Sequence, residues 1–150
     1  MQSIEWAGQR FELLPDKAVF WPARSTLIVA DVHLGKADHF RGAGIPVPRG
    51  TTAAVLRRLD AALSATRARR LLVLGDWFHA PPGLSRSLID QLIRWRSAKP
   101  RLTILIVRGN HDDAAGDPPE ALNIRCVGPV WEEAGLTFRH APPSQPAGFV

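Results

Sequence analysis

Cysteine is almost absent from this chain: Cys126 is the only one among 150 residues. No disulfide can form within the chain, and this fits a reducing compartment. The sequence also lacks any apolar run near the roughly 20 residues that a membrane span requires. Its first residues lack the apolar core of a signal peptide. We therefore expect a cytoplasmic protein with no membrane partner.

Three common enzyme signatures are missing as well. Gly42-Ala43-Gly44 has no third glycine at the spacing of a dinucleotide-binding loop, and Pro46 follows it closely. No Gly-Lys-Ser/Thr of a phosphate-binding loop occurs, and no Gly-x-Ser-x-Gly of a serine hydrolase. These absences argue against dinucleotide-dependent, nucleotide-triphosphatase and serine-hydrolase chemistry.

The composition is that of a folded protein, with 45% hydrophobic and 22% charged residues. A length of 150 residues suits one domain, and we expect a single domain over 1–150. The net charge of +5 favours anionic partners, of which nucleic acid is the obvious class. Many soluble proteins are equally basic, so charge alone leaves this open.

Apolar periodicity predicts an α/β fold. Continuous apolar runs predict strands at 26–30, 71–74 and 102–107. Helical spacing predicts one helix that begins near Thr51 and another that begins at Ser85. The resulting strand–helix–strand–helix–strand order predicts an α/β sheet with helices on both faces.

Shorter runs flank this central pattern. We expect a β-hairpin over 9–21, around Pro15-Asp16-Lys17, and a long loop over 34–50. Short antiparallel strands are expected at 124–127, 130–132 and 136–139. The arginines at 67, 69 and 70 are interpreted as cations at the carboxyl end of the first helix.

Polar motifs follow each central strand: Asp31-Val32-His33, Gly75-Asp76 and Gly109-Asn110-His111-Asp112. Alone, each has an ordinary structural reading, such as a loop hydrogen bond, a turn or an Asx-turn. Together they deliver oxygen and imidazole donors to one sheet edge, where open α/β folds place ligands. Alternation along a strand would let residues 31 and 33 converge on one ion. The set suits divalent transition metals.

These motifs resemble the signature of the calcineurin-like metallophosphoesterase superfamily. That signature reads Asp-x-His, Gly-Asp, Gly-Asn-His-Asp/Glu, an isolated His, then Gly-His-x-His. The segments 31–36, 41–50 and 74–79 are most similar to the ligase-associated DNA damage response endonucleases, the PdeM-type phosphoesterases. The resemblance implies a metallophosphoesterase-like sheet sandwich flanked by helices, with its C-terminal part missing.

The resemblance also implies a site with two divalent metal ions, of which Mn²⁺ is the best candidate and Fe or Zn²⁺ are alternatives. Asp31 and His33 would hold one metal, and Asp76 would bridge the two. Asn110 and His140 would hold the second metal. A histidine before a proline-rich tail, such as His140, is also often an ordinary surface residue.

Catalytic roles fall to Asp76, through the metals, and to His111, which would stabilise the transition state or protonate the leaving oxygen. Lys36, His39 and Arg41 would contact a DNA backbone, or would simply belong to a solvated loop.

His79 has two readings, a substrate contact or a histidine packed in a loop. Trp77 would either stack on a base or pack beneath the site, and we favour packing.

One element of the signature is missing, because no Gly-His-x-His occurs in the chain. Loss of two imidazoles would weaken metal binding. We interpret the chain as truncated; a contribution from a neighbouring chain and an impaired site are the other readings.

The expected function is hydrolysis of phosphodiester bonds by a two-metal enzyme, as a DNA repair endonuclease or phosphodiesterase with DNA as its partner. By family resemblance, DNA ligase and helicase are possible functional partners. One alternative is a catalytically impaired protein of the same fold that binds nucleic acid or partners without turnover. Another is the same chemistry on a nucleotide or a phosphoprotein.

Overall fold

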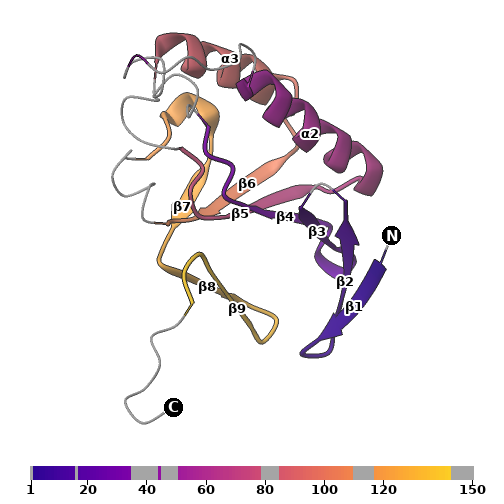
Figure 1. The fold of residues 1–150 in the computed structure, drawn as a ribbon. Helices are drawn as coiled ribbons and strands as arrows, with labels where there is room; N and C mark the ends of the chain where they lie inside the picture. The colour runs from indigo at the N-terminus through magenta and orange to yellow at the C-terminus, as the bar shows by residue number, and fades with distance from the viewer. Residues whose placement is uncertain are drawn as a thin grey trace.

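The computed structural model describes residues 2–15, 17–34, 44, 51–78, 85–109 and 117–142. Strands and helices alternate through the middle of the chain, and a strand hairpin follows them (Figure 1). The strands and the two α-helices are β1 (Gln2–Trp6), β2 (Gln9–Leu14), β3 (Ala18–Trp21), β4 (Thr26–Ala30), α2 (Thr51–Thr66), β5 (Arg70–Leu74), α3 (Arg86–Ser97), β6 (Thr103–Val107), β7 (Arg125–Val127), β8 (Val130–Glu133) and β9 (Leu136–Arg139). Short 3₁₀ turns are η1 (Pro22–Arg24) and η3 (Glu120–Leu122).

Seven strands form one sheet in the order β1-β2-β3-β4-β5-β6-β7. The strands β1 to β4 pair antiparallel, whereas β4 to β7 pair parallel. Ala30 of β4 is level with Leu74 of β5, and Leu74 is level with Val107 of β6. The carboxyl ends of the three predicted central strands therefore meet at one edge, as the sequence indicates.

The two α-helices of the described residues lie on the same face of the sheet, so for this part of the chain the expectation of helices on both faces is wrong. Figure 1 shows α2 and α3 together above the strands. Their buried residues, such as Leu59 and Leu92, share one apolar cluster with Leu71 of β5. The physical reason is topological. Both crossovers move the same way along the sheet, from β4 to β5 to β6, and a right-handed crossover then places each helix on the same side.

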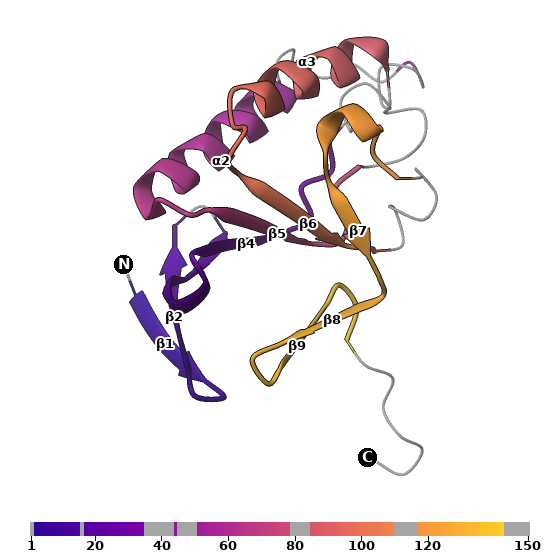
Figure 2. The ribbon, with the colours of Figure 1, turned by 180° about the vertical axis from the view of Figure 1, so that it is seen from behind.

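The opposite face is covered by the antiparallel β8–β9 hairpin (Figure 2). Leu136 and Phe138 of β9 are buried there with Leu72 of β5, in a second apolar cluster. The sheet is thus buried on both sides near β5, by helices on one and by strands on the other.

Local sequence patterns correctly predicted the start of α3 and one hairpin. Ser85 caps α3 as predicted, because its Oγ accepts a hydrogen bond from the Leu88 backbone N–H at 3.1 Å. The predicted hairpin over 9–21 is the β2–β3 pair. Strand β1 was not predicted, and its Trp6 is 69% exposed. No helix among the described residues is both long enough and apolar enough to span a bilayer.

Candidate metal centre

Two carboxylates and one imidazole meet at the carboxyl end of the central strands. Asp31 follows β4, Asp76 follows β5, and His140 follows β9. One potential ligand atom from each of these residues lies within 4.8 Å of the other two. Asp76 lies 45 residues after Asp31, and His140 lies 64 residues after Asp76, so three distant segments supply one compact donor set.

The backbone at this edge is in an unusual conformation. The φ angles of Asp31, His33 and Asp76 are 53°, 52° and 54°, in the left-handed region that residues other than glycine rarely occupy. Such conformations cost free energy and gather at functional sites. The backbone N–H of His33 donates to the Asp76 carbonyl at 2.8 Å, which ties the two segments together.

Asp31 and His33 approach each other, but not for the reason that the sequence suggested. Both lie beyond β4, so the alternation of a strand does not orient them as the sequence analysis assumed. The left-handed backbone brings His33 Nε2 to 3.7 Å from Asp31 Oδ1 instead.

Two glycines leave the space that these side chains occupy. A Cβ on Gly109 would lie 2.7 Å from Asp76 Oδ1 and 2.8 Å from His140 Cδ2. A Cβ on Gly75, whose φ is +74°, would overlap the His140 ring. The glycines of the Gly-Asp and Gly-Asn-His-Asp motifs therefore have a steric role at the site.

His140 is held in one orientation by the backbone of β5. Its Nδ1 lies 3.0 Å from the Leu74 carbonyl oxygen, which can only accept a hydrogen bond, so Nδ1 carries the proton. The remaining nitrogen, Nε2, lies 3.4 Å from Asp76 Oδ2. A histidine that donates one N–H to a backbone carbonyl and offers its other nitrogen is arranged as metal-ligating histidines are.

The donor chemistry suits a divalent transition metal. Asp76 is only 4% exposed, and it lies close to the carboxylate of Asp31. Two nearby carboxylates repel each other unless a cation or a proton lies between them. Mixed oxygen and nitrogen donors are typical of Mn²⁺, Fe and Zn²⁺ sites. The residues present therefore fit the metal group that the sequence motifs imply.

Several predicted site residues lie outside the described part of the chain. They are Asn110, His111, Lys36, His39, Arg41 and His79. The roles predicted for these six residues stay predictions.

Trp77 packs beneath the site, as favoured from the sequence. It is 1% exposed, and its ring lies 6.4 Å from the ring centroids of both Phe78 and Trp95. Such burial excludes stacking on a base in this conformation.

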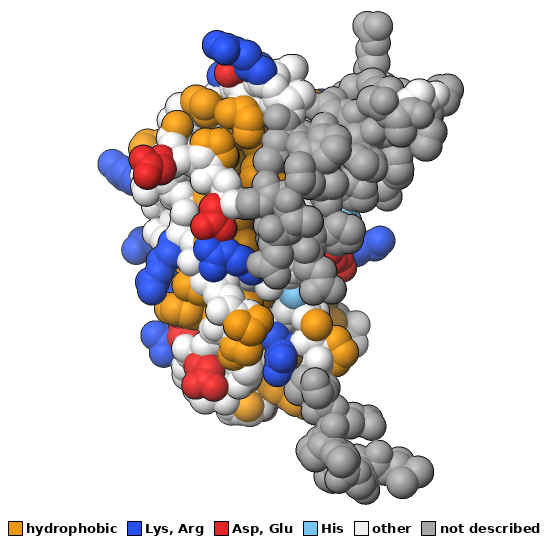
Figure 3. All heavy atoms as spheres, turned by 90° about the vertical axis from the view of Figure 1, so that its left-hand side faces the viewer, with side chains coloured by type: hydrophobic (Ala, Val, Ile, Leu, Met, Phe, Trp, Pro, Cys, Tyr) orange, Lys and Arg blue, Asp and Glu red, His pale blue; other side chains and the backbone are white. Residues whose placement is uncertain are grey.

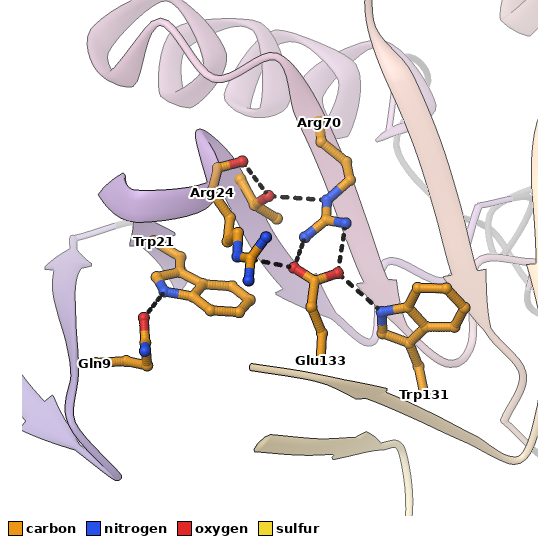
Figure 4. A network of polar contacts seen from close by, with 7 residues as sticks. Gln9, Trp21, Arg24, Arg70, Trp131 and Glu133 are labelled. Carbon is orange, nitrogen blue, oxygen red and sulfur yellow. Dashed lines mark hydrogen bonds and ion pairs between the residues drawn. The ribbon is translucent and has the colours of Figure 1, made fainter. Parts of the chain in front are cut away.

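Sequence reasoning missed one polar network, which lies at the opposite end of β5 from the site. Arg70 belongs to β5 and does not end α2, which stops at Thr66. Its guanidinium binds Glu133, 63 residues away, with two hydrogen bonds of 2.7 Å (Figure 4). No local pattern signals a pair so distant in the chain.

Figure 3 shows one face of the molecule. On the described part of this face, basic side chains are scattered, with acidic ones between them. The net charge of +5 is therefore not gathered into one basic stripe on that part of the surface.

Two comparisons with known proteins found matches. The model of the calcineurin-like phosphoesterase family matches residues 24–148. The crystal structure of the nuclease MPE from Pseudomonas putida superposes with a TM-score of 0.85 at 41% identity. The match covers 98% of this chain and 68% of that one. No curated protein matched the chain. The chain belongs to the calcineurin-like phosphoesterase family of metal-dependent hydrolases.

Proposed function

We propose that this protein is a phosphodiesterase that uses two divalent metal ions and cleaves nucleic acid. The observation that carries the proposal is the convergence of Asp31, Asp76 and His140 within 4.8 Å at the carboxyl edge of the sheet. Family membership supports a hydrolase, and the similar P. putida protein is a nuclease.

The proposed ligands divide between two ions. Asp31 and His33 would hold the first ion, Asp76 would contribute its carboxylate to both, and His140 with Asn110 would hold the second. When bound, the ions supply Lewis-acid stabilisation of the charge that develops during displacement at phosphorus. Mixed carboxylate and imidazole donors suit Mn²⁺, Fe and Zn²⁺. Of these, Mn²⁺ is the ion that we propose.

The chain itself fixes the donors before any ion binds. The Leu74 carbonyl holds the proton of His140 on Nδ1 and so keeps Nε2 available. Gly75 and Gly109 leave room for the ring and for the buried carboxylate of Asp76. Preorganised donors avoid the cost of reorganisation during the reaction. His111, by family resemblance, is the proposed proton donor to the leaving oxygen.

The proposed substrate is DNA. The net charge of +5 favours a polyanion, and Lys36, His39, Arg41 and His79 are the proposed contacts. A role in DNA repair beside a DNA ligase and a helicase, in the cytoplasm, extends the family resemblance and belongs to the same proposal.

The test is Mn²⁺-dependent hydrolysis of bis-p-nitrophenyl phosphate. Asp76→Asn should lower the rate by about 10³-fold or more, since it removes the bridging charge. Asp90→Asn makes the same chemical change on α3, where Asp90 Oδ2 lies 3.9 Å from Arg86 Nε, and should leave the rate unchanged. Full activity of Asp76→Asn would show that the assignment of Asp76 is wrong.

A second candidate, the alternative from the sequence analysis, is binding of nucleic acid without turnover. It predicts salt-sensitive DNA binding with no hydrolysis at any Mn²⁺ concentration. If hydrolysis is seen, plasmid nicking compared with nucleotide and phosphopeptide cleavage identifies the substrate class.

A further inference from the structure

The β8–β9 hairpin is attached to β5 at both of its ends. At one end, Glu133 of β8 accepts hydrogen bonds from both terminal nitrogens of Arg70, the first residue of β5, at 2.7 Å each. At the other end, His140 donates to the carbonyl of Leu74, the last residue of β5, at 3.0 Å. The ion pair and the candidate metal ligand therefore bracket one strand.

The apolar contact between these two attachments does not by itself fix the hairpin along the strand. Leu136 and Phe138 of β9 share their cluster with Leu72. Apolar burial is non-directional, so it tolerates small shifts. A two-bond guanidinium–carboxylate pair has a defined geometry and resists them.

Arg70 is itself held from behind. Its Nε donates to Thr26 Oγ1 at 2.8 Å, and the Thr26 hydroxyl donates to the Arg24 carbonyl at 2.8 Å. Thr26 is fully buried in β4. The cation is therefore oriented by the sheet rather than by the hairpin that it binds.

Glu133 has further partners of its own. Trp131 Nε1 donates to Oε1 at 3.2 Å, and Arg24 Nε lies 3.7 Å from Oε2 (Figure 4). The Glu133 side chain is 14% exposed and that of Arg70 is 20% exposed, so solvent screens the pair only in part. The hydrogen bonds from Arg70, more than the one from Trp131, hold the pKa of Glu133 below its usual range.

The hairpin transmits this position to His140. Glu133 pairs with Leu136 across the turn at Ala134-Gly135, and β9 then runs directly to His140. A shift of Glu133 relative to Arg70 would therefore move the imidazole relative to the Leu74 carbonyl and to Asp76.

We propose that Arg70 and Glu133 are positioning residues, which set the place of the β8–β9 hairpin along β5 and so hold the His140 imidazole against Asp76 and Asp31. The part that concerns the metal rests on the proposed function. The part that concerns the orientation of His140 does not.

The test compares Glu133→Gln with a matched control, Asp60→Asn. Asp60 also accepts from a cation and an indole, Lys99 Nζ at 2.7 Å and Trp95 Nε1 at 2.8 Å, but it lies on α2. Two quantities are measured: Mn²⁺ affinity by calorimetry, and, without metal, the ¹⁵N resonances of His140 that report the hydrogen bond of Nδ1.

We expect Glu133→Gln to weaken Mn²⁺ binding by about tenfold, as for loss of a group that supports a metal ligand. Without metal, the signature of a protonated, hydrogen-bonded Nδ1 should weaken. Asp60→Asn should change neither quantity. Unchanged His140 resonances in Glu133→Gln, or an equal change in Asp60→Asn, would overturn the proposal.

A double variant, Arg70→Met with Glu133→Met, separates positioning from stability. Replacement of a buried ion pair by apolar side chains often restores stability. We expect thermal stability to recover while the His140 resonances stay altered and Mn²⁺ binding stays weak. Recovery of all three together would show a merely structural role and would overturn the proposal.

The two parts fail separately. If the wild-type protein does not bind Mn²⁺, the proposed function fails, and the metal-free resonances of His140 still decide the positioning role.

Discussion

The two ends of strand β5 differ in the charges that meet there. At the amino end, Arg70 and Glu133 form an ion pair with two bonds of 2.7 Å. At the carboxyl end, Asp31 and Asp76 bring like charges together, with one imidazole between them. The first arrangement is complete in itself, whereas the second would gain stability from a cation.

Backbone conformation follows the same division. Arg70 lies within a regular strand, but Asp76, two residues beyond that strand, has a φ of 54°. Strained, like-charged residues cost stability and persist where they are needed for binding. On the proposals made above, the amino end of β5 holds the hairpin and the carboxyl end serves chemistry.

The largest expected effect on stability comes from Gly75→Ala at the carboxyl end. The new Cβ would overlap the His140 ring at a residue whose φ is +74°. We expect a loss of about 3 kcal/mol in the free energy of unfolding, and a loss of Mn²⁺ binding of about 100-fold. Chemical denaturation and calorimetry measure these quantities.

Gly8→Ala provides the control for Gly75→Ala. Gly8 has a φ of +77°, and nothing lies within 4 Å of its added Cβ, so this variant isolates the cost of the left-handed backbone. Equal losses in the two variants would contradict a steric role for Gly75 at the site.

The second effect concerns stability away from the site. Arg96 is buried, and burial lowers its pKa; it donates to the carbonyls of Leu122, Lys99 and Leu102 at 2.8, 2.6 and 2.6 Å. Arg96→Met should remove these three hydrogen bonds and lower the free energy of unfolding by about 2–3 kcal/mol. Mn²⁺ affinity of the folded protein should not change. A parallel fall in affinity would show that global stability, and not the local site, controls metal binding.

The third effect is a pH dependence at the amino end of β5. Because the folded-state pKa of Glu133 is lowered, its contribution is fully present above the unfolded-state pKa, about 4.3, and is lost as the pH falls through the lower folded-state value. When unfolding by urea is measured between about pH 7 and pH 3, the free energy of unfolding should therefore fall less for Glu133→Gln than for the wild type. An equal fall in the free energy of unfolding of both proteins toward low pH would argue against the ion pair.

The smallest effect is expected for Asp117→Asn. Its carboxylate binds Arg108 with two bonds of 2.9 and 2.7 Å, which also lower the pKa of Asp117. The Asp117 side chain is 59% exposed, so the loss should be only about 0.5 kcal/mol. A loss as large as that of Glu133→Gln would remove the distinction between a screened pair and a partly buried one.

The sequence predicted much of this fold because the decisive signals are local. Apolar runs located the central strands, Ser85 located the start of α3, and the strand-end motifs located Asp31 and Asp76. The face on which each helix lies depends on strand order, which no short pattern contains. The left-handed conformation of His33 and the pairing of Arg70 with Glu133 arise from tertiary contacts, so they carry no sequence signal.

The most direct test of the central claim is anomalous X-ray diffraction from crystals that hold Mn²⁺. We expect an anomalous peak at bonding distance from the Asp31 and Asp76 carboxylates and from His140 Nε2. A fully occupied Mn²⁺ that touches none of these three side chains would contradict the central claim.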